Sequence, residues 1–149
     1  MILKPSAEAT WAGPVLEGSG KVTTKSKALE NTSYSFASRT SENNQHQTSP
    51  EELIAAAHSS CYSMYLSLLI TQKGYTIHML KTKATVKLHH VYEDLVIEEI
   101  NLSVTANIPG ISTEEFVELA DVAKFTCPVS KALGMVPIIL TEVKLDYDV

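Results

Sequence analysis

The chain has 149 residues, which suits one domain with a sizeable hydrophobic core. Apolar residues make up 44% of it and charged residues 19%, and the formal net charge is −5. The sequence contains no basic block and no interleaving of aromatic and basic residues, which argues against nucleic acid as a partner. We therefore expect one globular domain over residues 1–149.

The opening segment MILKPSAEAT lacks the apolar core of a secretory signal peptide, which predicts a cytoplasmic location. Only two cysteines occur, Cys61 and Cys127, and this is too few for a disulfide scaffold. In a reducing compartment such a pair is either two free thiols or a transient redox couple. Because unpaired cysteine is among the most buried residue types, two inert core thiols are the competing interpretation.

The first third of the chain predicts short β-strands followed by a polar loop. Three segments, 7–13, 20–29 and 33–39, are rich in strand-forming residues and are separated by glycine and asparagine. The segment TSENNQHQTS, residues 40–49, is polar throughout and predicts the loop.

A long helix is predicted to begin directly after this loop. Ser49, Pro50 and Glu52 suit its N-cap, N1 and N3 positions, the pattern of a capping box, and the helix would extend ~36 Å. Gly74 suits its end. Residues 53–72 carry no formal charge, so the helix is either fully buried or in a membrane. Serine, threonine, glutamine and histidine side chains interrupt this run, and we therefore expect a buried helix and no membrane.

Two long strands are predicted next, over residues 76–90 and 95–108, with a turn at residues 92–94. Ser112 and Glu115 form a second capping box and open another helix. Its apolar face contains Phe116, Leu119, Ala120 and Ala123.

The helix is expected to break at Cys127, because Pro128 disfavours helical geometry in the residue before it. Cys127 would then be the N-cap of a short helix. Apolar and polar residues alternate over residues 143–149 and predict a half-buried C-terminal strand. Together the elements predict an α+β fold with a central apolar helix and mostly antiparallel strands.

Both cysteines are candidates for chemistry. Cys127, at a helix N-terminus, faces free N–H groups that favour the thiolate, although a small apolar residue before a proline is an equally good interpretation. Cys61 lies in the middle of a helix and gains nothing from a helix terminus, so it needs a cation nearby. His58 lies three residues earlier on nearly the same face, but a core histidine with a satisfied hydrogen bond is the more common case.

Arg39 is the better candidate for that cation, because arginine stays charged in an apolar setting. It is the only arginine in the chain, and an ordinary surface charge is the alternative. A buried arginine needs a carboxylate partner. Glu51 is the nearest carboxylate that the capping box leaves free, unless it is simply an acid in the first turn of a helix.

Glu51 and Cys61 would lie ~15 Å apart along a continuous helix and on different faces. Either Arg39 spans part of that distance, or the site combines residues from two chains. A helix that is apolar on most faces also suggests burial by a partner subunit. Both arguments predict a homodimer.

The histidines and cysteines do not predict a metal site. His58 and Cys61 form a single pair of suitable spacing, and the side chains of His89 and His90 diverge if they lie on a strand. There is no CxxC or HxxxH motif and no second close pair of ligands. A Cys-His-Asp acyl-transfer enzyme is a further possibility, but no candidate acid and no oxyanion loop stand out in the sequence.

Six segments carry a resemblance that covers the chain almost from end to end. They are ATWAG, GKVTTKS, FASR, SPEELIAAAHSSCYSMYLSLL, IPGIS and TCPVSKAL. The most specific are the block from Pro50 to Cys61 and the CPVS around Cys127. In these segments and in their order, the chain resembles the OsmC/Ohr family of thiol peroxidases, and the OsmC branch in particular.

The resemblance implies a function in oxidative or osmotic stress defence. Cys61 would be the thiolate that attacks an organic hydroperoxide, or less readily hydrogen peroxide, and becomes a sulfenic acid. Cys127 would be the resolving cysteine that forms a disulfide with it. Arg39 would stabilise the Cys61 thiolate, and Glu51 would hold Arg39. No bound cofactor is implied, and an external dithiol of lipoyl type would regenerate the thiols.

The resemblance also implies the architecture: an intertwined α+β homodimer in which antiparallel β-sheets enclose central apolar helices, with active sites at the subunit interface. The alternative function is a non-catalytic ligand-binding or structural dimer with inert buried thiols. Thiol reactivity separates the two, because inert thiols resist peroxide and alkylating agents until the protein unfolds.

Overall fold

The computed structural model describes residues 1–41 and 46–149. Its contacts divide the chain into two compact units, residues 1–53 and residues 54–149. That these units form one domain stays a prediction. The polar loop expected at residues 40–49 falls partly on residues 42–45, which lie outside the described residues.

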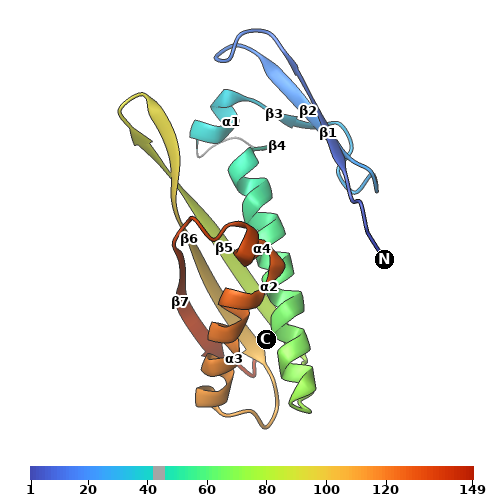
Figure 1. The fold of residues 1–149 in the computed structure, drawn as a ribbon, viewed down its shortest axis with the longest axis vertical. Coiled ribbons are helices and arrows are strands. Elements are labelled where there is room, and N and C mark those ends of the chain that lie inside the picture. Colours follow the sequence, from blue (N-terminus) through green and yellow to red (C-terminus); the bar gives the residue numbers. More distant parts are fainter. Residues whose placement is uncertain (42–45) are drawn as a thin grey trace. The chain divides into compact units, whose positions relative to one another are not determined.

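The first unit contains a four-stranded sheet (Figure 1). Its first three strands, β1 (Ala7–Ala12), β2 (Ser19–Thr24) and β3 (Thr32–Tyr34), pair antiparallel in sequence order, and β4 (Gln47–Thr48) pairs parallel to β3. Between β1 and β2 the chain turns at Gly13, whose φ of +92° favours glycine. The three strands expected in this part of the chain are therefore present, with the third one shorter than predicted.

The helix α1 (Phe36–Thr40) replaces the second half of the strand expected at residues 33–39. Ser35 Oγ accepts a hydrogen bond from the backbone N–H of Ser38 at 3.1 Å, and Ser38 Oγ accepts one from the N–H of Ser35 at 2.9 Å. This reciprocal capping box satisfies free N–H groups and starts a helical turn directly after Tyr34. The prediction of a continuous strand was wrong because alternating serine and aromatic residues imitate one.

The long predicted helix is confirmed as α2 (Pro50–Gln72), with 23 residues. The backbone N–H of Glu52 donates to Ser49 Oγ at 3.1 Å, as expected of an N-cap. The carboxylate of Glu52 accepts a hydrogen bond from the hydroxyl of Thr48 at 3.0 Å. After the helix, Gly74 adopts a φ of +89°, the left-handed geometry that commonly follows a helix end.

The second unit contains a three-stranded sheet in the order β5–β6–β7 (Figure 1). An antiparallel hairpin is formed by β5 (Met79–Val91) and β6 (Asp94–Asn107), which confirms the two long strands. Tyr92 forms the predicted turn with a φ of +56°. On the other side of β6 lies β7 (Ile138–Leu145), which pairs parallel to it.

The strand expected at residues 143–149 is displaced, because β7 begins at Ile138 and ends at Leu145. Ile138 and Leu140 pack against the core in the first half of β7, and Val143 does so in the second half, with a register shift between them. The shift interrupts the period of two, so the alternation in the sequence marks only the last part of the strand.

The core of the second unit lies where α2 and α3 (Thr113–Thr126) pack on the sheet (Figure 1). The backbone N–H of Glu115 donates to Ser112 Oγ at 3.1 Å, which confirms the N-cap of α3. The predicted apolar face of α3 is buried. The fully buried hydrophobic residues are Tyr62, Leu66, Ile70, Ile100, Leu102, Ala106, Ile108, Phe116, Ala120, Ala123 and Cys127.

One face of α2 is buried within the second unit and another face is exposed. The buried residues recur every four positions and are His58, Tyr62, Leu66 and Ile70. On the exposed face, 70% of Met64 and 48% of Leu68 are accessible. Within the single chain α2 is therefore buried on one face, and its burial by a partner subunit stays a prediction. By length and composition α2 could also cross a membrane, a test that core helices pass as well.

Candidate active site

Two helices of the second unit bring the cysteines together. Cys61 is half-buried in the middle of α2, and Cys127 is fully buried where α3 ends and α4 (Pro128–Ala132) begins. The backbone N–H of Cys127 donates to the carbonyl of Ala123 at 3.0 Å and ends α3. Its ψ of 133° is the extended geometry that Pro128 favours, so the predicted break and N-cap are confirmed.

The sulfur atoms of Cys61 and Cys127 are in direct contact. Cys127 Sγ lies 3.3 Å from Cys61 Sγ, as a thiol hydrogen bond, and both cysteines are free. A disulfide requires about 2.05 Å between the sulfurs, so the bond would form by a small approach of two side chains that already touch.

The surroundings of Cys61 act on its pKa in both directions. Burial raises the pKa most, the backbone N–H of Val129 lowers it, and the neighbouring thiol of Cys127 raises it. Val129 lies in the first turn of α4, so this lowering of the Cys61 pKa comes from the start of another helix.

The sulfur of Cys127 has a backbone partner of its own in the same short helix. The N–H of Ser130 donates to Cys127 Sγ at 3.5 Å. The start of α4 thus acts on both sulfurs, through the Ser130 N–H on Cys127 and through the backbone of Val129 on the pKa of Cys61. The sequence reasoning singled out neither residue, although their i+2 and i+3 positions after an N-cap cysteine could have identified them.

His58 is a buried, neutral residue beside this pair. Its side chain has an exposed fraction of 0%, and Nε2 shares a hydrogen bond of 2.8 Å with Ser130 Oγ. Burial lowers the pKa of His58, which disfavours the imidazolium. Within the described residues, Nδ1 has no hydrogen-bond partner. These features fit the core histidine expected as the common case rather than a cation for Cys61.

In the first unit, Arg39 and Glu51 form an ion pair. Arg39 Nε lies 3.1 Å from Glu51 Oε1 and 3.2 Å from Oε2, and the two side chains are 30% and 13% exposed. Arg39 comes from the last turn of α1 and Glu51 from the first turn of α2. The structure thus places the predicted arginine against the predicted carboxylate.

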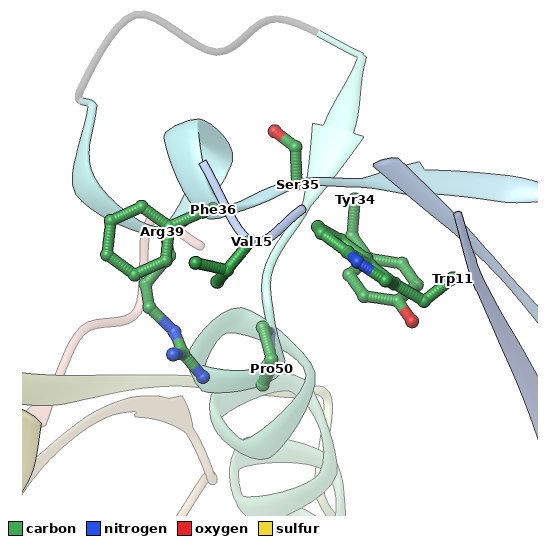
Figure 2. Close-up of a pocket in the computed structure, with 7 residues that line it drawn as sticks. All are labelled: Trp11, Val15, Tyr34, Ser35, Phe36, Arg39 and Pro50. Carbon is green, nitrogen blue, oxygen red and sulfur yellow. The ribbon is translucent and has the colours of Figure 1, made fainter. Parts of the chain in front are cut away.

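Arg39 also borders a pocket of about 170 Å³ in the first unit (Figure 2). Figure 2 shows Trp11 against Tyr34 on one side, with ring centroids 5.6 Å apart, and Phe36 beside Arg39 on the other. Val15, Ser35 and Pro50 complete the lining of the pocket. The three rings are the only aromatic residues in positions 1–53, a signal that the sequence reasoning did not use.

The four predicted site residues thus form two contacting pairs. Arg39 pairs with Glu51 in the first unit, and Cys61 pairs with Cys127 in the second. In residues 1–41 and 46–149 there is no group of three or more histidine, cysteine, aspartate and glutamate side chains that could hold a metal ion.

Comparison with known proteins identifies relatives of the whole chain. Residues 42–141 match the sequence profile of the family described as OsmC-like protein. Peroxiredoxin OsmC of Escherichia coli (strain K12) is 36% identical over 147 residues, which cover 99% of this chain and 97% of that protein. The peroxiredoxin OsmC of Shigella flexneri matches equally well.

Solved structures agree with this assignment. An organic hydroperoxide resistance protein from Elizabethkingia anophelis has a TM-score of 0.72 at 25% identity, covering 98% of this chain and 100% of the other. An OsmC-like protein from Mycoplasma pneumoniae shares the fold, with a TM-score of 0.74 at 18% identity and the same coverage. The expected α+β fold is therefore confirmed, and the chain belongs to the OsmC family.

Proposed function

We propose that this protein is a cysteine-based peroxidase that reduces organic hydroperoxides, with hydrogen peroxide a poorer substrate. The observation that carries the proposal is the 3.3 Å contact between Cys61 Sγ and Cys127 Sγ. Two reduced thiols in contact can give up two electrons to one peroxide and become a disulfide. The relatives named peroxiredoxin support a function of this type.

The reaction has two steps in this proposal. The Cys61 thiolate attacks the terminal oxygen of the hydroperoxide, the O–O bond breaks, and the alcohol leaves after taking up a proton. Cys61 is then a sulfenic acid. The sulfur of Cys127 attacks the sulfur of Cys61, a disulfide forms, and the hydroxyl group leaves with a proton as water.

The difference in exposure supports the assignment of the two roles. Cys61 is half-buried, whereas Cys127 has an exposed fraction of 0%. An external oxidant therefore meets Cys61 first, and the shielded Cys127 reacts with the product of that encounter. This order is the one that the resemblance to the family implies.

Arg39 is the proposed cation for the Cys61 thiolate, and Glu51 is proposed to orient Arg39. A cation is needed because burial raises the pKa of Cys61. Glu51 contacts Arg39 through Nε, and the guanidinium has further N–H donors on its terminal nitrogens. An arginine held in this way can serve a second anion without losing its carboxylate partner.

The pocket beside Arg39 is proposed to accept the organic part of the substrate. Its lining is mostly apolar and includes the rings of Trp11, Tyr34 and Phe36. Such a surface stabilises an alkyl or aryl group, which hydrogen peroxide lacks. This difference is the proposed basis for preferring organic hydroperoxides.

Regeneration is proposed to use an external dithiol of lipoyl type and no bound cofactor. One thiol of the reductant attacks the Cys61–Cys127 disulfide and forms a mixed disulfide. Its second thiol then closes a disulfide within the reductant and releases both protein thiols. A cytoplasmic location, where disulfides are kept reduced, belongs to the same proposal.

The protein is also proposed to be a homodimer with active sites at the subunit interface. The exposed face of α2, with Met64 and Leu68, is an apolar surface of the kind that a second subunit covers. Burial by an identical chain would complete the enclosure that the apolar composition of α2 predicts.

A thiol count on the native protein tests the proposed function. One equivalent of cumene hydroperoxide is expected to remove both thiols and to lower the intact mass by about 2 Da, two hydrogens, per chain. Two thiols that survive unchanged would contradict the peroxidase. They would favour a ligand-binding or structural dimer with inert thiols.

A further inference from the structure

A second contact joins the two helices that carry the cysteines. His58 precedes Cys61 by three residues on α2, and Ser130 follows Cys127 by three residues on α4. The side chains of His58 and Ser130 share a hydrogen bond of 2.8 Å. Because residues three apart are neighbours on a helix, this bond lies beside the 3.3 Å contact of the sulfurs.

This hydrogen bond lies inside the protein, where it is costly to break. The exposed fractions of His58 and Ser130 are 0% and 4%. A buried polar group that loses its partner cannot turn to water, so the pair resists separation. Ser130 also donates its backbone N–H to Cys127 Sγ at 3.5 Å, so a movement of Ser130 displaces a partner of the thiol.

We infer that the His58–Ser130 hydrogen bond is a clamp that holds α4 against α2 while the cysteines are reduced, and so determines how readily their disulfide forms. His58 and Ser130 are positioning residues in this scheme, because they act through the placement of Cys127. The inference rests on the proposed function for the role of Cys127 as the resolving thiol.

The short length of α4 explains why a clamp has an effect. A helix of five residues is too short to be stable alone, so its position depends on the contacts that dock it. The effective concentration of Cys127 at Cys61 rises with the fraction of time that the docked arrangement exists. The disulfide and the clamp hold the same helix, and linkage requires that each favours the other.

Equilibration with glutathione measures this coupling without any peroxide. Both thiols of the protein and one oxidised glutathione give the Cys61–Cys127 disulfide and two reduced glutathiones, a two-electron exchange. The equilibrium constant follows from alkylation of the remaining thiols and intact mass over a series of glutathione ratios. Ser130→Ala keeps the backbone N–H and removes only the hydroxyl, and we expect it to lower the constant roughly three- to tenfold.

Two further variants separate the clamp from a general loss of stability. The double variant His58→Leu with Ser130→Ala removes both polar partners, which leaves no buried group unsatisfied and favours normal folding. It is expected to lower the constant as much as Ser130→Ala alone. His58→Gln places an amide nitrogen near the position of Nε2 and is expected to restore the constant to within about twofold of the original.

Ser63→Ala is the matched control. It removes a hydrogen bond of 2.7 Å from α2 to Thr82 on β5 and leaves α4 untouched. We expect no change in its glutathione equilibrium. An unchanged constant in both Ser130→Ala and the double variant would overturn the clamp, and so would an equal loss in Ser63→Ala. Failure of the unaltered protein to form the disulfide at any ratio would instead overturn the proposed function and remove the basis of the clamp.

Discussion

Arg39 Nε is almost equidistant from the two carboxylate oxygens of Glu51, at 3.1 Å and 3.2 Å. Both carboxylate oxygens therefore converge on one nitrogen, which holds the Nε side of the guanidinium at the start of α2. If Arg39 stabilises the Cys61 thiolate, the orientation given by Glu51 is part of the first chemical step.

Glu51→Gln is therefore expected to slow the oxidation of Cys61 by roughly tenfold, because the neutral amide holds the guanidinium less firmly. The measurement is the rate of loss of the first thiol under rapid mixing with cumene hydroperoxide. Glu52→Gln is a matched control, since Glu52 lies one residue along the same helical turn and accepts from Thr48. Equal rates for the two variants would contradict the role of Glu51.

Replacement of each cysteine is expected to affect peroxide turnover in a different way. Cys61→Ser should abolish peroxide turnover, because the hydroxyl is not a comparable nucleophile. Cys127→Ser should consume about one equivalent of peroxide per chain and then stop, with a sulfenic acid left on Cys61. Peroxide consumption with a dithiol, followed by trapping of the sulfenic acid, checks both outcomes. Full cycling by Cys61→Ser would refute the assignment.

The aromatic pocket makes a prediction about substrate choice. Trp11→Ala removes the largest ring of the lining and should raise KM for cumene hydroperoxide by roughly three- to tenfold. Hydrogen peroxide has no organic group to lose contact with, so its kcat/KM should change little. Steady-state kinetics with both substrates test this prediction. An equal loss of kcat/KM for cumene hydroperoxide and hydrogen peroxide would argue against substrate binding in this pocket.

His58 predicts a pH dependence of stability. Burial lowers its pKa in the folded state, so the unfolded chain binds the proton more readily. The free energy of unfolding should therefore be highest above the ordinary histidine pKa of about 6.5 and fall as the pH drops towards the lowered folded value. The limiting slope is about 1.4 kcal/mol per pH unit for one proton.

Urea unfolding at a series of pH values measures this dependence. In His58→Gln the component due to the imidazole is lost, and the free energy of unfolding should fall less steeply below about pH 6.5. An unchanged pH dependence in this variant would show that the destabilisation comes from other groups.

The exposed face of α2 predicts the oligomeric state. Leu68→Lys should convert the proposed homodimer to monomer, because a charge would be buried without a partner at the interface. Sedimentation velocity gives the mass in solution. Val122→Lys is the control, since Val122 on α3 is 45% exposed and Leu68 is 48% exposed. Dimers that persist with Leu68→Lys would place the interface elsewhere.

Local patterns in the sequence were sufficient for most of the elements. Capping residues identified the starts of α2 and α3, and Pro128 identified the break at Cys127. Two elements were misread for local reasons, and the two-residue strand β4 was missed because it lies in the segment predicted as a polar loop. Reciprocal serine bonds make a helix of α1, and a register shift hides the first half of β7.

The prediction of the roles of the site residues depended on the resemblance to a family rather than on local sequence patterns. Nothing in the sequence alone indicates that residues 66 positions apart bring their sulfurs to 3.3 Å, because that contact depends on how α4 packs on α2. For the same reason the partnership of His58 with Ser130 could not be predicted. The pairing of Arg39 with Glu51 could be predicted from the sequence, because both residues lie close to the start of the same helix.

Cys127 is also the residue at which one helix stops and the next begins, and this affects how its replacements should be interpreted. Its sulfur occupies the N-cap position of α4, where serine is among the preferred residues and alanine is not. Cys127→Ser thus keeps an acceptor for the helix N-terminus while removing the redox chemistry. Cys127→Ala removes both, at a cost of about 1 kcal/mol in helix stability. A functional defect is attributable to the missing thiol only in the serine variant.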